Sequence, residues 1–231
     1  MSIKEFISEL NGSRVEGELV KTIFYSLLTS FVFLGILYFW QFRNIGEFMP
    51  KYGLFLFFSA LSYAIIVPSI RQIRAYKELP CMSGMMVGMT TGMIASFLPG
   101  FYIASTNGMF YGGFFGVAVG IVFGIWNGKC CGIMGAMEGI MAGFMGGLMG
   151  AMTAFMLLND HLTATAVIIF IIGAVIIFGL NYMIYREAKA AEMERHLKED
   201  YFLVVIITFV LIAITTWLMI YGPRGGIFAV S

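Results

Sequence analysis

The sequence predicts an all-α polytopic membrane helix bundle of about seven transmembrane helices, with the N-terminus in, the C-terminus out and a glycine-zipper core. Of its 231 residues, 60% are hydrophobic and only 12% are charged, about half the charged share of a soluble domain. The mean hydropathy is +0.90. Seven segments approach the roughly 20 apolar residues that a membrane helix needs, namely 22–40, 52–70, 81–103, 108–126, 131–158, 162–185 and 201–221.

The composition also excludes several classes of function. The 14 Lys and Arg residues are balanced by 13 Asp and Glu residues, so no basic domain for nucleic acid exists. We find no nucleophile–base pair, no carboxylate cluster and no cofactor fingerprint, and therefore expect no enzyme. Three cysteines are too few for a disulfide framework.

The first segment, residues 1–20, precedes the spans and carries charges of both signs. Phe6, Ile7 and Leu10 are spaced for one face of a short helix. This pattern predicts a cytoplasmic amphipathic segment on the membrane surface. A solvated tail fits the same residues.

Two pairs of ordinary spans frame the chain. Residues 21–80 hold two spans rich in Phe, Leu and Ile, and residues 159–231 hold two rich in Ile, Val and Phe. A charged loop at 186–200 separates the last two spans. Its mixed charges include Glu192 and His196 and are typical of a solvated helix rather than a metal site.

The distribution of basic residues predicts the orientation. With seven spans, the N-terminal side of the membrane carries eleven Lys and Arg and the other side three, so the N-terminus is expected inside by the positive-inside rule. The eleven are Lys4, Arg14, Lys21, Arg71, Arg74, Lys77, Lys129, Arg186, Lys189, Arg195 and Lys198, and the three are Arg43, Lys51 and Arg224.

The middle zone, residues 81–158, differs from the frame and is expected to be a three-helix functional module. It contains 13 of the 18 Met and 18 of the 28 Gly. In its second span a glycine occurs at every fourth residue, which is the pattern of an extended glycine zipper. These glycines are Gly108, Gly112, Gly116, Gly120, Gly124 and Gly128.

Methionines occupy one face of the other two spans of this module. At about 100° per residue, they share one side of each helix while glycines occupy another side. The first set is Met82, Met85, Met86, Met89 and Met93, and the second is Met134, Met137, Met141, Met145, Met149, Met152 and Met156. A methionine stripe is more often packing than ligand, because methionine fills gaps between helices. Leucine packs equally well, however, and is nearly absent here.

Thioethers and thiolates are soft ligands that select Cu(I), and by the same chemistry Ag(I). The predicted metal ligands combine both kinds: Cys81, Met85, Met89, Met93, Cys130, Cys131, Met134, Met137, Met141, Met145, Met149 and Met152. The three cysteines fall at the predicted cytoplasmic ends of their helices, where thiols stay reduced. They are equally consistent with small buried residues.

Glu138 is the one acid inside a span, within the methionine face, and is expected to attract a cation on the ion path. A pair with Lys129 is the competing interpretation. Asp160 and His161 follow Met156 at the other end of this span and are more consistent with a loop cap than with a metal site.

The Met-x-x-x-Met spacing of Met82/Met86, Met89/Met93, Met137/Met141 and Met145/Met149, beside Gly-x-x-x-Gly, resembles the signature of Ctr-type copper transporters. That resemblance implies Cu(I) transport. The chain differs from the family in having seven spans rather than three and the motif on two helices. It also resembles small Met- and Gly-rich prokaryotic membrane proteins, which implies a prokaryotic cytoplasmic membrane.

Two functions follow as hypotheses. The first is a passive membrane channel or carrier for Cu(I) or Ag(I) along the methionine faces, with no other cofactor. A homo-oligomer and a metal chaperone are its expected partners. The second is a non-catalytic structural or assembly subunit of a larger membrane complex.

Overall fold

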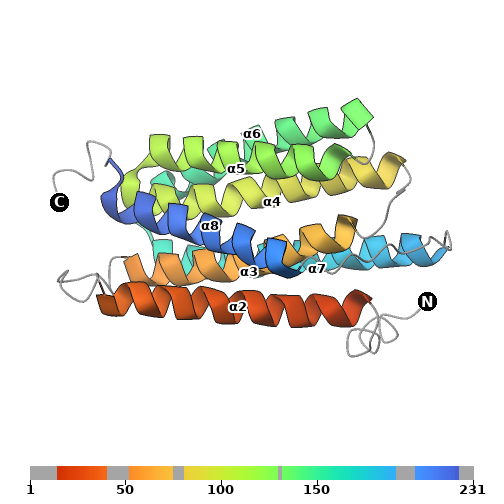
Figure 1. The fold of residues 1–231 in the computed structure, drawn as a ribbon. Helices are drawn as coiled ribbons and strands as arrows, with labels where there is room; N and C mark the ends of the chain where they lie inside the picture. The colour runs from red at the N-terminus through yellow and green to blue at the C-terminus, as the bar shows by residue number, and fades with distance from the viewer. Residues whose placement is uncertain (1–14, 41–51, 75–80, 130–131, 191–200, 224–231) are drawn as a thin grey trace.

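The computed structural model describes residues 15–40, 52–74, 81–129, 132–190 and 201–223, and this part of the chain forms seven helices and no strand (Figure 1). The helices are α2 (Val15–Trp40), α3 (Leu54–Arg74), α4 (Cys81–Asn107), α5 (Met109–Gly128), α6 (Gly132–Met156), α7 (Leu162–Ala190) and α8 (Tyr201–Tyr221). Each predicted span coincides with one helix. The all-helical prediction is therefore confirmed.

Five of these helices are long and apolar enough to cross a membrane: Met82–Asn107, Met109–Gly128, Gly132–Met156, Leu162–Glu187 and Phe202–Tyr221. The apolar parts of α2 and α3 are shorter, at Lys21–Ile36 and Leu54–Ile70. These helices indicate a membrane-embedded protein.

The helix ends differ in detail from the predicted spans. A single residue, Gly108, separates α4 from α5, because α4 continues through Pro99 to Asn107. Gly108 has φ 109°, a backbone conformation that a side chain would oppose, so glycine suits this one-residue break. Helix α7 extends beyond its predicted span into the charged loop, as far as Ala190.

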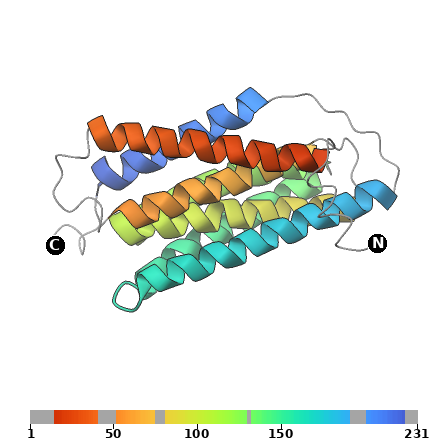
Figure 2. The same ribbon diagram turned by 90° about the horizontal axis from the view of Figure 1, so that it is seen from below.

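The helices form two groups (Figures 1 and 2). Helices α4, α5 and α6 pack tightly on one another, and α2, α3, α7 and α8 make up the second group. Helix α4 joins the two groups, because it also packs on α3, α7 and α8. We call α4, α5 and α6 the three-helix module and the remaining helices the frame.

Glycines bring the module's helices into backbone contact. A methyl group added at Gly116 of α5 would lie 2.7 Å from the Ser96 carbonyl oxygen of α4 and 3.1 Å from the Gly147 Cα of α6. One turn away, a methyl group at Gly120 would lie 3.0 Å from the Gly92 carbonyl oxygen and 2.9 Å from the Gly143 Cα. No side chain larger than hydrogen fits at these positions without displacing a neighbouring backbone.

The same contacts fix the relative direction of α4 and α6. A methyl group at Gly88 would lie 3.3 Å from the Gly135 carbonyl oxygen, and one at Gly92 would lie 2.9 Å from that of Gly139. Farther along, the corresponding contact joins Gly100 to Gly147, at 2.9 Å. Residue numbers rise together on both helices, so α4 and α6 are parallel and α5 returns between them.

Hydrogen bonds from buried polar side chains connect several of the other helix pairs. Ser26 Oγ of α2 donates to Thr208 Oγ1 of α8 at 3.3 Å. Ser69 Oγ of α3 donates to Asn181 Oδ1 of α7 at 3.1 Å. In α4, the Asn107 amide donates to the Leu218 carbonyl oxygen of α8 at 2.7 Å. Such bonds are worth about 0.6 kcal/mol each in membrane proteins, so they add orientation more than stability.

Substituting Gly120 by Ala is expected to destabilise the protein by about 1–3 kcal/mol, the usual cost of overpacking. Melting of the detergent-purified protein, followed by loss of monodisperse material on heating, measures the change. The matched control is Gly179→Ala in α7, where an added methyl group meets nothing within 4 Å. Because alanine favours the helix over glycine, this control should be as stable as the parent or more so. Equal melting of both variants would show that the glycine contacts are not tight.

Candidate metal-binding surface

The methionines of α6 all lie on the outside of the chain. All seven are between 46% and 69% exposed, and they are Met134, Met137, Met141, Met145, Met149, Met152 and Met156. The opposite side of the helix carries the buried glycines that contact α4 and α5. The large side chains face outward because the inner side has room for hydrogen atoms only.

The methionines of α4 are also exposed, although α4 is the most enclosed helix of the module. Met82, Met86, Met89 and Met93 range from 37% to 75% exposed, and Met85 is half-buried. This row stops at Met93, whereas the row on α6 continues to Met156.

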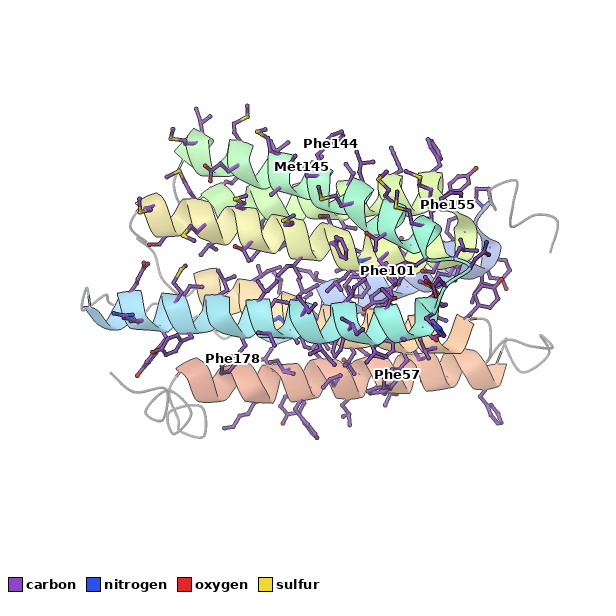
Figure 3. All side chains as sticks on the ribbon, turned by 180° about the vertical axis from the view of Figure 1, so that it is seen from behind. Phe57, Phe101, Phe144, Met145, Phe155 and Phe178 are labelled. Atoms are coloured by element: carbon purple, nitrogen blue, oxygen red, sulfur yellow. The ribbon has the colours of Figure 1, made fainter. Side chains whose placement is uncertain are left out.

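Part of each row lies beside the line along which α4 meets α6, and we call this line the α4–α6 groove. Met93 lies directly against α6, because a methyl group at Gly146 would come within 3.1 Å of the Met93 Cα. Helix α5 contacts other faces of both helices, through Gly116, Gly120 and Gly124. On a helical wheel, Met137 and Met141 point away from both α4 and α5, whereas Met145 and Met149 lie within about 100° of Gly146, beside α4 on the side of the pair that faces away from α5. Figure 3 shows this side, with Met145 pointing outward from α6.

We call the eleven exposed methionines of α4 and α6 the methionine surface. They are Met82, Met86, Met89, Met93, Met134, Met137, Met141, Met145, Met149, Met152 and Met156. Within one chain this surface does not enclose a path, because its side chains point away from the packed glycine interior of the module.

Glu138 lies within this surface and is half-buried. It follows the start of α6 by six residues, about 9 Å along the helix axis. Among the described residues no ion pair joins it to Lys129, which is exposed at the end of α5. The pairing of Glu138 with Lys129 is therefore not seen. By insertion scales a charge deep in the bilayer costs about 2.5–3.5 kcal/mol, so this carboxylate needs a compensating cation, a proton or water.

Outward-facing residues elsewhere in the chain are of a different kind. On α7 the exposed large side chains are Val167, Ile168, Ile171, Ile172, Val175, Ile176 and Phe178. On α8 they are likewise aliphatic or aromatic, and the described methionines of these two helices, Met183 and Met219, are half-buried and buried. Methionine is thus concentrated on the outside of α4 and α6.

The predicted cysteine ligands lie at the edge of what the structure describes. Cys81 is the first residue of α4, and its side chain is not among those described. Cys130 and Cys131 lie outside the described residues, between α5 and α6. Among the described residues no group of three or more His, Cys, Asp or Glu side chains forms a metal site.

Asp160 and His161 form an exposed turn between α6 and α7, with 3.9 Å between Asp160 Oδ1 and His161 Nε2. His161 has φ 39°, in the left-handed region, so it acts as a turn residue. This geometry is consistent with the loop cap that the sequence favours.

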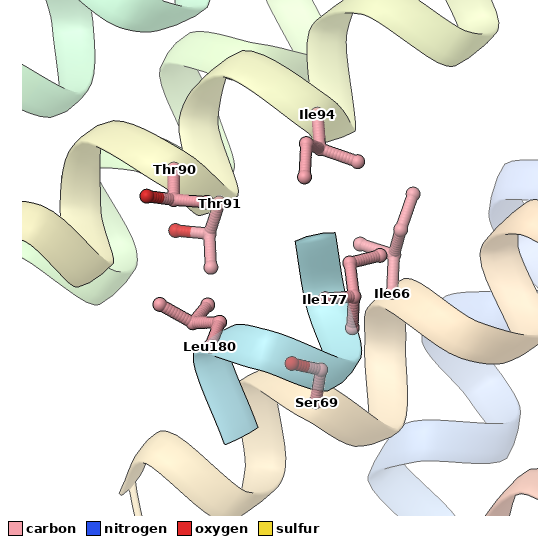
Figure 4. A pocket seen from close by; sticks show the side chains of 7 residues that line it. All are labelled: Ile66, Ser69, Thr90, Thr91, Ile94, Ile177 and Leu180. Carbon is pink, nitrogen blue, oxygen red and sulfur yellow. The ribbon is translucent and has the colours of Figure 1, made fainter. Parts of the chain in front are cut away.

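Sequence reasoning missed a polar layer inside the bundle. Asn127 of α5 donates to Thr91 Oγ1 of α4 at 3.2 Å. Thr91 also borders a small hollow between α3, α4 and α7, lined by Ile66, Ser69, Thr90, Thr91, Ile94, Ile177 and Leu180 (Figure 4). Its volume of about 10 Å³ is at the lower limit for one water molecule. The hollow is thus too small for an ion path.

No protein-family model matches the chain, and neither a curated protein nor a solved structure matches it significantly. The function is therefore argued from the residues and their geometry.

Replacing both Met141 and Met145 by Leu is expected to leave stability nearly unchanged. Both side chains are more than half exposed, and Met-to-Leu exchanges cost under about 1.5 kcal/mol even in packed cores. Thermal melting in detergent checks this. Gly143→Leu, on the opposite side of the same helix, is the destabilising comparison, because its added atoms would meet the Gly120 and Ile121 backbone. A large loss of stability in the double leucine variant would mean that these methionines are packed in the native protein.

Proposed function

We propose that the protein is a passive channel or carrier for a soft monovalent metal ion, Cu(I) or Ag(I), that moves along the methionine surface between the subunits of a homo-oligomer. The observation that carries this proposal is the contrast between outward-facing residues within one molecule. On α7 and α8 the outward-facing residues that would contact lipid are mainly Ile, Val and Phe. The eleven methionines outside α4 and α6 therefore require a reason other than lipid contact.

Thioether chemistry supplies that reason. A thioether is neutral and soft, so it binds Cu(I) or Ag(I) without adding a charged ligand to the membrane, and only the charge of the ion itself remains. Conduction needs sites that admit an ion and also release it. On α6 successive methionines are three or four residues apart, about 4.5–6 Å along the axis. An ion released by one thioether therefore meets the next within one helical turn.

The remaining features of the proposal follow from the sequence pattern. All seven helices cross the membrane, the N-terminus is cytoplasmic and the glycines of α5 form a zipper that holds α4 and α6 together. Cys81, Cys130 and Cys131 then lie at the cytoplasmic end of the methionine surface, where thiolates would bind the ion more tightly. There they would exchange it with a metal chaperone of a prokaryotic cell.

The exposure of the methionine surface in a single chain also favours a second function, a structural or assembly subunit. Methionine is flexible and adapts to different partners. A surface of this kind could dock on a neighbouring subunit of a membrane complex without binding any metal. The transport experiment below separates the two functions.

In proteoliposomes, the parent protein is expected to accelerate Cu(I) entry, and Met141→Leu with Met145→Leu should slow it about tenfold, since two adjacent soft ligands are lost. Metal content of the washed vesicles, measured by mass spectrometry, gives the rate. The control is Met109→Leu on α5, an exposed methionine outside the methionine surface. Equal rates for parent and double variant would make the thioethers packing residues. No uptake by the parent would favour the structural subunit.

The orientation is tested by single-cysteine labelling in intact cells, in a background without the native cysteines. An impermeant maleimide should label Asp160→Cys, in the exposed turn after α6, and should not label Lys129→Cys at the other end of the module. The positive-inside rule predicts this result, because Lys129 lies on the basic side. The reverse pattern would invert the topology.

A further inference from the structure

Glu138 lies at the same height in the membrane as the methionines of α4. A methyl group at Gly88 would lie 3.3 Å from the Gly135 carbonyl oxygen, and one at Gly92 would lie 2.9 Å from that of Gly139. Residue 138 of α6 is therefore level with residues 88–92 of α4. Met89 lies within this stretch, and Met93 lies one turn beyond Met89.

Glu138 and these methionines also border the same groove. On α6, Glu138, Ala142 and Gly146 follow one another at intervals of four residues, which places them along one side of the helix. Gly146 contacts the Met93 backbone, and Ala142 is 5% exposed. Glu138 continues this line by one turn beyond Ala142. Because Ala142 has a small side chain and Gly146 has none, the backbones of the two helices form the bottom of the groove.

We propose that the α4–α6 groove contains a binding site for one soft monovalent cation, formed by the Glu138 carboxylate together with the thioethers of Met89 and Met93. The ligand class rests on the proposed function. The position rests on the helix contacts above, which place the bound ion at the level of Glu138 and Met89 within the methionine surface.

Charge balance selects a monovalent ion at this level. One carboxylate neutralises one Cu(I) or Ag(I), so the occupied site carries no net charge into the membrane. A divalent ion would leave one positive charge uncompensated. Thioethers also disfavour Na⁺, Ca²⁺ and Mg²⁺, which take oxygen ligands.

The groove offers such a site only in the half of the module that contains Glu138. The methionines of α4 end at Met93, so both helices carry exposed thioethers only at the levels of Met82 to Met93 of α4. Beyond that level α6 alone supplies them, through Met149, Met152 and Met156. An ion held by both helices and by the carboxylate binds more tightly than one held by a single row.

Silver binding to the purified full chain tests this site. Cys81, Cys130 and Cys131 are replaced by Ser so that thiols do not dominate, and Ag(I) is used because it is not oxidised in air. Equilibrium dialysis against a competing thioether, with silver measured by mass spectrometry, should show one tight ion per chain. Glu138→Gln, and separately Met89→Leu with Met93→Leu, should weaken this binding about tenfold or more. Excess Na⁺ or Ca²⁺ should not displace the silver.

The controls are Met109→Leu, a methionine outside the methionine surface, and Asp160→Asn, an acid outside the spans. Both should bind silver as the parent does. X-ray absorption of the bound silver should show sulfur neighbours and an oxygen neighbour that is lost in Glu138→Gln. Melting of the metal-free variants verifies folding, and Glu138→Asp, which keeps the charge, should retain most of the affinity if Glu138→Gln fails to fold.

The results separate the site from the transport function. Unchanged silver affinity in Glu138→Gln, or an equal loss in Met109→Leu, would refute the site even if the parent transports Cu(I). Loss of binding in the groove variants alone would support the site even if no Cu(I) crosses the vesicle membrane, and transport would then be the part that fails.

Discussion

Backbone contact between α4, α5 and α6 is the constraint on which the rest of this molecule depends. Gly116 and Gly120 of α5 touch the backbones of both neighbouring helices. Lipid tails are as apolar as these side chains, so the hydrophobic effect does not drive membrane helices together. Close packing then provides most of the attraction. The glycines are therefore the feature that assembles the module.

That contact determines where every large side chain of the module can go. Helix α6 has its glycines on the inner side, so Met141 and its neighbours can only face outward. Helix α4 has a third side as well, on which Phe101 and Tyr102 are fully buried against the frame. This leaves the methionines of α4 the strip beside α6. The methionine surface is thus a geometric result of the glycine pattern, and its chemistry comes from the choice of Met over Leu at those positions.

Much of the fold could be predicted from the sequence, because the length and hydropathy of apolar segments identify membrane helices. The seven helices and the sorting of Gly from Met around α6 follow from residue spacing alone. The pairing of α4 with α6 could not be predicted. Gly92 meets Gly139, 47 residues later in the chain, and residue spacing within one helix does not show which residues of another helix it contacts. The Thr91–Asn127 bond was also missed, since a single Asn near a span end resembles a turn residue. The metal ligands themselves remain a prediction, and the cysteines lie outside the described side chains.

The frame has a different consequence, for the order in which the chain assembles during synthesis. The module is built from three consecutive helices, so its contacts can form as soon as α6 has been made. Helix α2 packs on α3 and on α8, and its bond from Ser26 to Thr208 spans 182 residues. Helix α2 therefore keeps one side without its partner helix until α8 has been synthesised. A chain truncated before α8 would leave this side of α2 open to other membrane proteins.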